Sequence, residues 1–348
     1  MMYESLDVSK MWTLSTGKIV EKQMALFASS CIYEHLAHSL ILDVSDSIWT
    51  EYFTTEEIKE IMNTNRTTLP SLPEDLSNYI NSFDKEFVKP LDLYYQAHSN
   101  VFHPFQEKDK KWVQQICSSA ADLYLYKVLD NYNTLESKVK HRVWNFLYTV
   151  FDGSKVKVEI GEKSSVASAI RRNSERRLEG QEMRRRKNMD MLFFYDDCEL
   201  GCTEVGKNSV GVDDDKYMGD GMLKLPKAMK DMLCMASKVC LSHLRDFRMI
   251  GYIIMEVVML DSPVGYVSRI VRTDVFKYPK NINSFSVDII PIIEIIWKTK
   301  VVMETTMKAI ENRQKKVADF YFALPTPTIP PCFNRSDVKT PQKRKFED

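Results

Sequence analysis

Two acidic residues stand beside apolar runs in the stretch MDMLFFYDDCELGCTEVGK, which spans residues 189–207. Asp190 precedes the run MLFF, and Glu204 lies inside the alternating run LGCTEV. A carboxylate in a strand interior is costly to bury without a partner. Two carboxylates on neighbouring strands can share a divalent cation, and Mg²⁺ is the usual hard cation for oxygen ligands. The alternative is that both acids lie on a solvated face of an amphipathic hairpin.

A lysine close to such a pair could steady a phosphate or help to generate an attacking hydroxide. Lys207 follows Glu204 in EVGK, and Lys224 and Lys227 lie at the start of the next predicted helix. We therefore take Asp190, Glu204, Lys207, Lys224 and Lys227 as candidate catalytic residues.

A basic stretch precedes the two acids. Residues 162–187 contain nine Lys or Arg and four Glu, in a chain that is neutral overall. Cations on such a helix could neutralise several phosphates of a nucleic-acid backbone, and binding would then depend strongly on salt. The candidate phosphate-binding residues are Arg171, Arg172, Arg176 and Arg177. A solvated helix face explains the same pattern equally well.

The composition excludes a globally basic protein, because 48 Lys and Arg balance 48 Asp and Glu in 348 residues. Seven cysteines without a CxxC pair are typical of a reducing interior. The N-terminus lacks the pattern of a signal peptide, and the most apolar stretch, residues 249–260, is too short to cross a bilayer. These features predict an intracellular protein that is not secreted and has no membrane partner.

The last residues differ in composition from the rest of the chain. ALPTPTIPP is typical of a polyproline linker, and the polar residues after it predict a disordered tail. Lys343, Arg344 and Lys345 resemble the short basic cluster of a nuclear-import signal. The alternative is a tail that only aids solubility, so the chain is expected in the nucleus or in the cytoplasm.

Hydrophobic periodicity predicts an α+β (mixed α/β) protein. Residues 1–150 form a mostly helical N-terminal region, 151–320 an α/β core that ends in a long helix, and 321–348 the disordered tail. Within the core we expect a strand at 155–162, a basic helix at 164–187 and a hairpin at 189–207. A helix at 220–238, single strands at 249–260 and 265–279, and a helix at 284–317 follow.

This order of features resembles the PD-(D/E)XK nuclease superfamily. In that superfamily a helix carrying Glu precedes a strand with Asp, a hairpin leads to a strand with (D/E)-x-K, and a helix follows. The resemblance covers roughly residues 155–275 and implies a restriction-endonuclease-like core sheet. Glu162 would match the helix Glu, Asp190 the strand Asp and Glu204 the acid of the last motif. It further implies that Asp190, Glu204 and, as an accessory ligand, Glu162 hold Mg²⁺.

The chain departs from that motif at one position, since Gly206 stands where the motif has lysine and Lys207 comes one residue late. Strand alternation would turn Lys207 away from the face of Glu204. A bulge at Gly206 could restore it, Lys224 or Lys227 could replace it from the helix, or the site is inactive.

Most of the chain also resembles an expanded family of uncharacterised mucoromycote fungal proteins. The similar stretches are MWTLSTGKIVE, GEKSS, DGMLKLPKAMKDML and VMETTMKAI.

Two classes of function follow from these observations. The first is a metal-dependent nuclease-like protein that acts on phosphodiester bonds of DNA or RNA. The alternative is a non-catalytic module on the same scaffold that binds nucleic acid or protein, or a structural or assembly protein. In the alternatives, the helical N-terminal region is the part expected to contact a protein partner.

Overall fold

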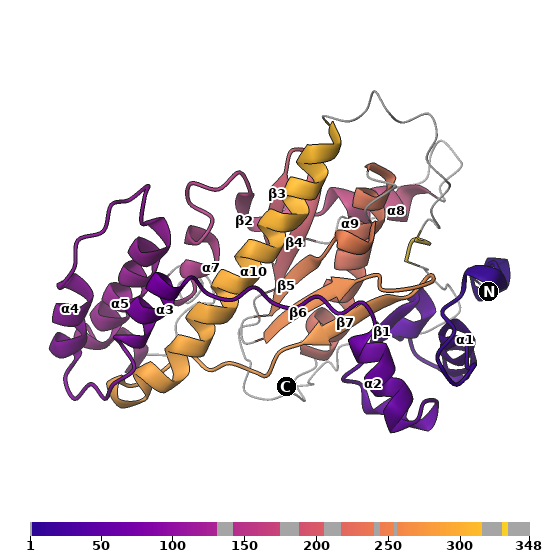
Figure 1. Cartoon of the computed structure of the whole chain (residues 1–348), viewed down its shortest axis with the longest axis horizontal. Helices are drawn as coiled ribbons and strands as arrows, with labels where there is room; N and C mark the ends of the chain where they lie inside the picture. Colours follow the sequence, from indigo (N-terminus) through magenta and orange to yellow (C-terminus); the bar gives the residue numbers. More distant parts are fainter. Residues whose placement is uncertain are drawn as a thin grey trace, which may run out of the picture.

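The fold is α+β, as the sequence predicts, and is built on one mixed sheet of seven strands (Figure 1). The structure is a computed structural model that describes residues 2–130, 142–174, 188–204, 217–239, 244–253, 256–314 and 329–332. Statements below refer to these residues.

The sheet has the strand order β1-β7-β6-β5-β4-β3-β2. Strands β2, β3 and β4 form an antiparallel meander, and so do β5, β6 and β7. The two meanders join where β4 runs parallel to β5, and β1 runs parallel to β7 at the opposite edge from β2. The strands are β1 (Ile41–Asp43), β2 (Lys157–Ser164), β3 (Asn188–Tyr195), β4 (Cys198–Glu204), β5 (Met249–Ile253), β6 (Glu256–Asp261) and β7 (Ser268–Arg272).

The predicted hairpin at 189–207 is present as β3 and β4, with Asp196 between them in the left-handed region at φ 49°. The prediction of a single strand at 249–260 was wrong. That stretch is the hairpin of β5 and β6, in which Ile253 pairs with Glu256. Both strands are mostly buried and, apart from Glu256 and Asp261 at the ends of β6, contain no charged residue. The sequence therefore shows neither alternation nor a Gly or Pro at the reversal.

Helices surround the sheet. They are α1 (Val20–Ser30), α2 (Thr55–Asn63), α3 (Glu74–Asn81), α4 (Pro90–His98), α5 (Lys108–Leu125), α7 (Phe146–Thr149), α8 (Val166–Ser174), α9 (Leu225–Val239) and α10 (Phe285–Gln314). A π-helical segment, Tyr217–Lys224, leads into α9.

The long helices α9 and α10 cover opposite faces of the sheet. A Cβ added to Gly251 would collide with Leu225 and Met229 of α9, whereas one added to Gly201 would come within 3.0 Å of the Met303 side chain of α10. Because Gly251 pairs with Cys202, even-numbered positions at this end of β4 face α9.

The N-terminal region packs onto the sheet and contributes a strand to it. One hydrophobic cluster joins Leu36, Ile41 and residues of α3 to α5 with the sheet, α9 and α10. The boundary predicted near residue 150 therefore does not separate two hydrophobic cores. Strand β1 was not predicted, because three residues are too few to show a period.

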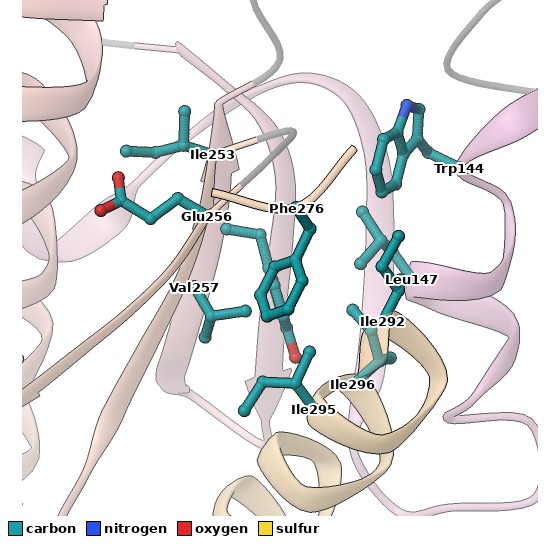
Figure 2. Close-up of a pocket in the computed structure, with 10 residues that line it drawn as sticks. Trp144, Leu147, Ile253, Glu256, Val257, Phe276, Ile292, Ile295 and Ile296 are labelled. Atoms are coloured by element: carbon teal, nitrogen blue, oxygen red, sulfur yellow. The ribbon is translucent and has the colours of Figure 1, made fainter. Parts of the chain in front are cut away.

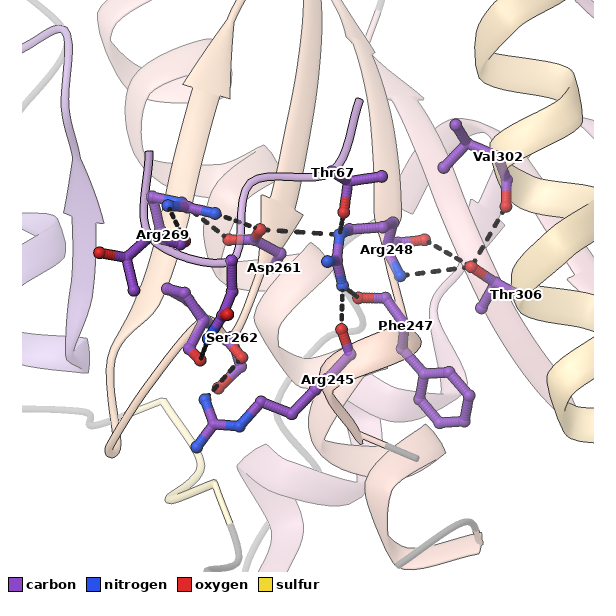
Figure 3. A network of polar contacts seen from close by, with 12 residues as sticks. Thr67, Arg245, Phe247, Arg248, Asp261, Ser262, Arg269, Val302 and Thr306 are labelled. Carbon is purple, nitrogen blue, oxygen red and sulfur yellow. Dashed lines mark hydrogen bonds and ion pairs between the residues drawn. The ribbon is translucent and has the colours of Figure 1, made fainter. Parts of the chain in front are cut away.

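Buried arginines fasten the N-terminal region to the sheet (Figure 3). Arg269 of β7 binds both carboxylate oxygens of Asp261 in β6, at 3.1 and 2.6 Å. It also donates to the carbonyls of Ile61, Met62 and Thr64, which end α2 without helical partners of their own. Three residues further along β7, Arg272 donates to Asp43 of β1 at 2.6 Å.

We expect Arg269→Met to lower the free energy of unfolding by about 3–5 kcal/mol, because it leaves Asp261 and the end of α2 buried without their strongest donor. Urea unfolding followed by circular dichroism measures this. The exposed Arg66, changed to Met, serves as the control and should shift stability by less than about 0.5 kcal/mol. Equal effects of the two variants would show that the buried network adds no stability.

Candidate active site

The register of β3 and β4 sets the two predicted acids opposite each other. Met191 pairs with Thr203 and Leu192 with Cys202. Continued by one residue, the same register sets Asp190 opposite Glu204. Directly opposite residues of an antiparallel pair project from the same face. Both acids therefore lie on the α9 face of the sheet, at the carboxyl end of β4.

Lys224 is the lysine that reaches this pair. Its Nζ lies 2.6 Å from Oε1 of Glu204, and only 18% of the Lys224 side chain and 8% of the Glu204 side chain are exposed. Lys224 ends the π-helical segment that enters α9. Such π segments are uncommon and are frequent at functional sites. Lys207, the alternative three residues after Glu204 in sequence, lies outside the described residues.

Lys227 does not join the acids. Its Nζ pairs with Glu34 of the N-terminal region. One turn further, the fully buried Lys230 donates to the carbonyl of Ser39, and burial lowers the pKa of Lys230 to about 8. These two lysines therefore dock the N-terminal region onto α9, which corrects the prediction of a catalytic role for Lys227.

Glu162 lies in strand β2 and not on a helix, which corrects its match to the helix Glu of the resemblance. The β2–β3 register shifts between Ile160 and Lys163, and Gly161 supplies φ +94° in this bulge. The Glu162 carboxylate accepts a hydrogen bond from Nδ2 of Asn188 at 3.4 Å. Within the described ranges, no three His, Cys, Asp or Glu side chains gather so as to hold a metal ion. Of the three predicted ligands, Glu162 is therefore not gathered with Asp190 and Glu204.

Arg171, predicted to contact phosphates, is held inside the protein. Its Nε lies 2.8 and 2.9 Å from the two carboxylate oxygens of Asp231 in α9, and its side chain is 9% exposed. Ser168 also donates to Asp231, at 2.9 Å. The ion pair therefore joins α8 to α9. Arg172 is half-buried on α8, whereas Arg176, Arg177 and the tail residues Lys343, Arg344 and Lys345 lie outside the described residues.

Glu199 is a structural acid that the sequence analysis missed. It accepts hydrogen bonds from Ser165 Oγ and from the backbone of Val166, both at 2.7 Å, and of Ala167 at 3.3 Å. The carboxylate thereby caps the N-terminus of α8 from strand β4. Burial raises the pKa of Glu199 despite these hydrogen bonds. Ser165, just before α8, could have signalled the helix start in the sequence. The sequence does not show that its partner is Glu199, because that residue lies 34 positions away.

A hollow lies away from these acids, between α10, α7 and the β5–β6 hairpin (Figure 2). Its empty volume is about 260 Å³, including space open to solvent, and Trp144, Phe276 and Ile295 are among its apolar walls. Glu256 is the one acidic residue in the lining, and its carboxylate accepts a hydrogen bond from Arg272 at 3.1 Å. This hollow therefore lacks the paired acids found on the other face of the sheet.

We expect Arg171→Gln to lower the free energy of unfolding by about 3–5 kcal/mol, because Asp231 loses its buried partner. The salt dependence of nucleic-acid retention should stay unchanged, because the buried Arg171 is paired with Asp231 and is not available to a phosphate. Urea unfolding and salt-gradient binding measure the two quantities. A salt slope reduced by about one at unchanged stability would instead identify Arg171 as a phosphate contact.

In the described parts of the chain, no helix is both long and apolar enough to span a bilayer. Comparisons with protein families, with curated proteins and with solved structures found no match to this chain.

Proposed function

We propose that this chain is a metal-dependent nuclease-like protein that hydrolyses phosphodiester bonds of DNA or RNA. The observation that carries the proposal is the contact of Lys224 with the buried Glu204, beside the strand position that holds Asp190. Acid, acid and lysine come from β3, β4 and the entrance to α9. Their position on one face supports the part of the resemblance to PD-(D/E)XK nucleases that concerns Asp190, Glu204 and a lysine from the following helix.

The donor set fits a magnesium ion. Two carboxylates from adjacent strands supply hard oxygen ligands, and Mg²⁺ usually keeps several waters alongside one or two carboxylates. Asp190 and Glu204 would hold the ion, which lowers the pKa of a bound water and offsets charge on a phosphate. The bulge at Gly161 holds Glu162 on the neighbouring strand, where it contacts Asn188 and does not belong to the pair.

The residues of the chain would divide the remaining work. Lys224 is held by Glu204, so its ammonium can donate to a phosphate oxygen without first being ordered. Glu204 fixes the position of the ammonium through this contact. The ion pair between Arg171 of α8 and Asp231 of α9 helps to hold α9, which directly follows Lys224, in place.

One observation favours the alternative of a non-catalytic module. Lys224 already forms an ion pair with Glu204, so Glu204 has a cationic partner without a metal ion. In that case the same face binds nucleic acid or a protein without cleaving it. Location in the nucleus remains a proposal that depends on Lys343, Arg344 and Lys345.

We expect the purified chain to cleave DNA or RNA with Mg²⁺ or Mn²⁺, and not with EDTA. Glu204→Gln, Asp190→Asn and Lys224→Met should each slow cleavage by about 100-fold or more, because each removes a group that acts on the reacting phosphate. Gel-based cleavage of single- and double-stranded substrates measures the rates. Manganese titration by calorimetry should show weaker ion binding in the two acid variants alone.

Glu159→Gln and Lys163→Met are matched controls, because these side chains are about half exposed and pair with each other on β2. Both should cleave like the wild type. Retained binding with no cleavage by any variant or ion would favour the non-catalytic module. If Glu204→Gln still binds nucleic acid and still cleaves it like the wild type, the candidate site is rejected.

A further inference from the structure

Residues 329–332, the C-terminal strap, are packed against α9, although the sequence predicts them within a disordered tail (Figure 1). Ile329 is 3% exposed and Cys332 4% exposed, and both belong to the main hydrophobic cluster. Cys234 Sγ lies 3.5 Å from the carbonyl oxygen of Ile329, and Cys332 Sγ lies 3.4 Å from that of Lys227.

These two contacts fix the direction of the strap. Ile329 lies beside Cys234 and Cys332 beside Lys227, so the strap runs antiparallel to α9. Seven residues of helix rise by about 10 Å, which is about the length of three extended residues. The strap is therefore extended, and it ends one helical turn from Lys224, the residue that contacts Glu204.

The strap is held by few interactions. Pro330 and Pro331 have no backbone N–H, so the strap cannot add a full ladder of backbone hydrogen bonds. Thiol hydrogen bonds are weak. Burial of two side chains must outweigh the entropy lost on ordering the segment, although the two prolines reduce that loss. A segment with few buried contacts opens at a lower free energy than the core of the fold.

We propose that the C-terminal strap is a clamp that opens locally while the rest of the chain stays folded, and that its closure holds the first turns of α9 so that Lys224 remains on Glu204. Opening uncovers Cys234 and Cys332 together, because Cys332 belongs to the strap and Cys234 contacts its Ile329. The opening itself is independent of any catalytic activity, whereas its effect on cleavage rests on the function proposed above.

The two thiols report the state of the clamp. Burial raises the pKa of Cys332 to about 12 and also raises that of Cys234, so neither thiol reacts while the strap is closed. In the open state both meet solvent and react with an alkylating agent through their thiolates. Cys117 and Cys202 are buried beneath other elements and serve as internal references.

Native full-length protein is treated with N-ethylmaleimide for increasing times, and each cysteine is quantified by peptide mass spectrometry. We expect Cys234 and Cys332 to react at one common rate, at least about tenfold faster than Cys117 and Cys202. Ile329→Asp should raise the common rate by a further tenfold or more, because a carboxylate cannot stay buried there. Val287→Asp on α10, where the valine is 76% exposed, is the matched control and should change neither rate.

Reaction of Cys234 only together with Cys117 and Cys202 would overturn the clamp, since it would mean that global unfolding exposes all four thiols. An unchanged Cys234 rate in Ile329→Asp would overturn it as well. The milder Ile329→Ala gives the same comparison if the Asp variant does not fold. If labelling behaves as expected but cleavage is absent in every variant, the clamp stands and the proposed nuclease function fails.

Discussion

The antiparallel register of β3 and β4 is the constraint on which the candidate site depends. It sets Asp190 opposite Glu204 and directs both toward α9. Lys224, the last residue of the π-helical segment that leads into α9, contacts Glu204 there. A shift of the register by one residue would turn Asp190 to the α10 face and leave Glu204 with the lysine alone. The irregularity between Phe193 and Phe194 lies on the far side of the regular pairs, so it does not disturb the acids.

The same face of the sheet also depends on helix α9, which polar contacts with α8 and with the N-terminal region hold in place. Asp231 binds Arg171 of α8, Lys227 pairs with Glu34 and Lys230 donates to Ser39 of the N-terminal region. The charges on α9 therefore serve mainly to assemble the fold. Lys224 differs from the others because its partner, Glu204, belongs to the end of a strand at the candidate site.

The sequence predicted those parts of the fold that have strong local signals. The β3–β4 hairpin, helix α9 and the long helix α10 show clear periods or turn residues, and the α+β class follows from them. Missed were β1, with three residues, and the reversal inside 249–260, which has no turn residue. Partners were harder still, since Arg171 meets an acid 60 positions away and Lys227 one 193 positions away. The sequence shows where a helix carries an arginine or lysine, but not which acid will pair with it. Exposed and buried arginines therefore look alike in sequence.

Strand β1 has a consequence for how the chain is made. Its Asp43 binds Arg272, a residue 229 positions later, and among the described strands β1 pairs with β7 alone. During synthesis the N-terminal helices leave the ribosome long before the strand that completes their core exists. Until then the apolar side chains of this region, among them Ile41 and Trp49, lack some of the residues that bury them in the folded protein. Contacts of such high sequence separation slow folding and prolong the exposure of apolar surface, so the nascent chain should depend on chaperones until residue 272 has emerged.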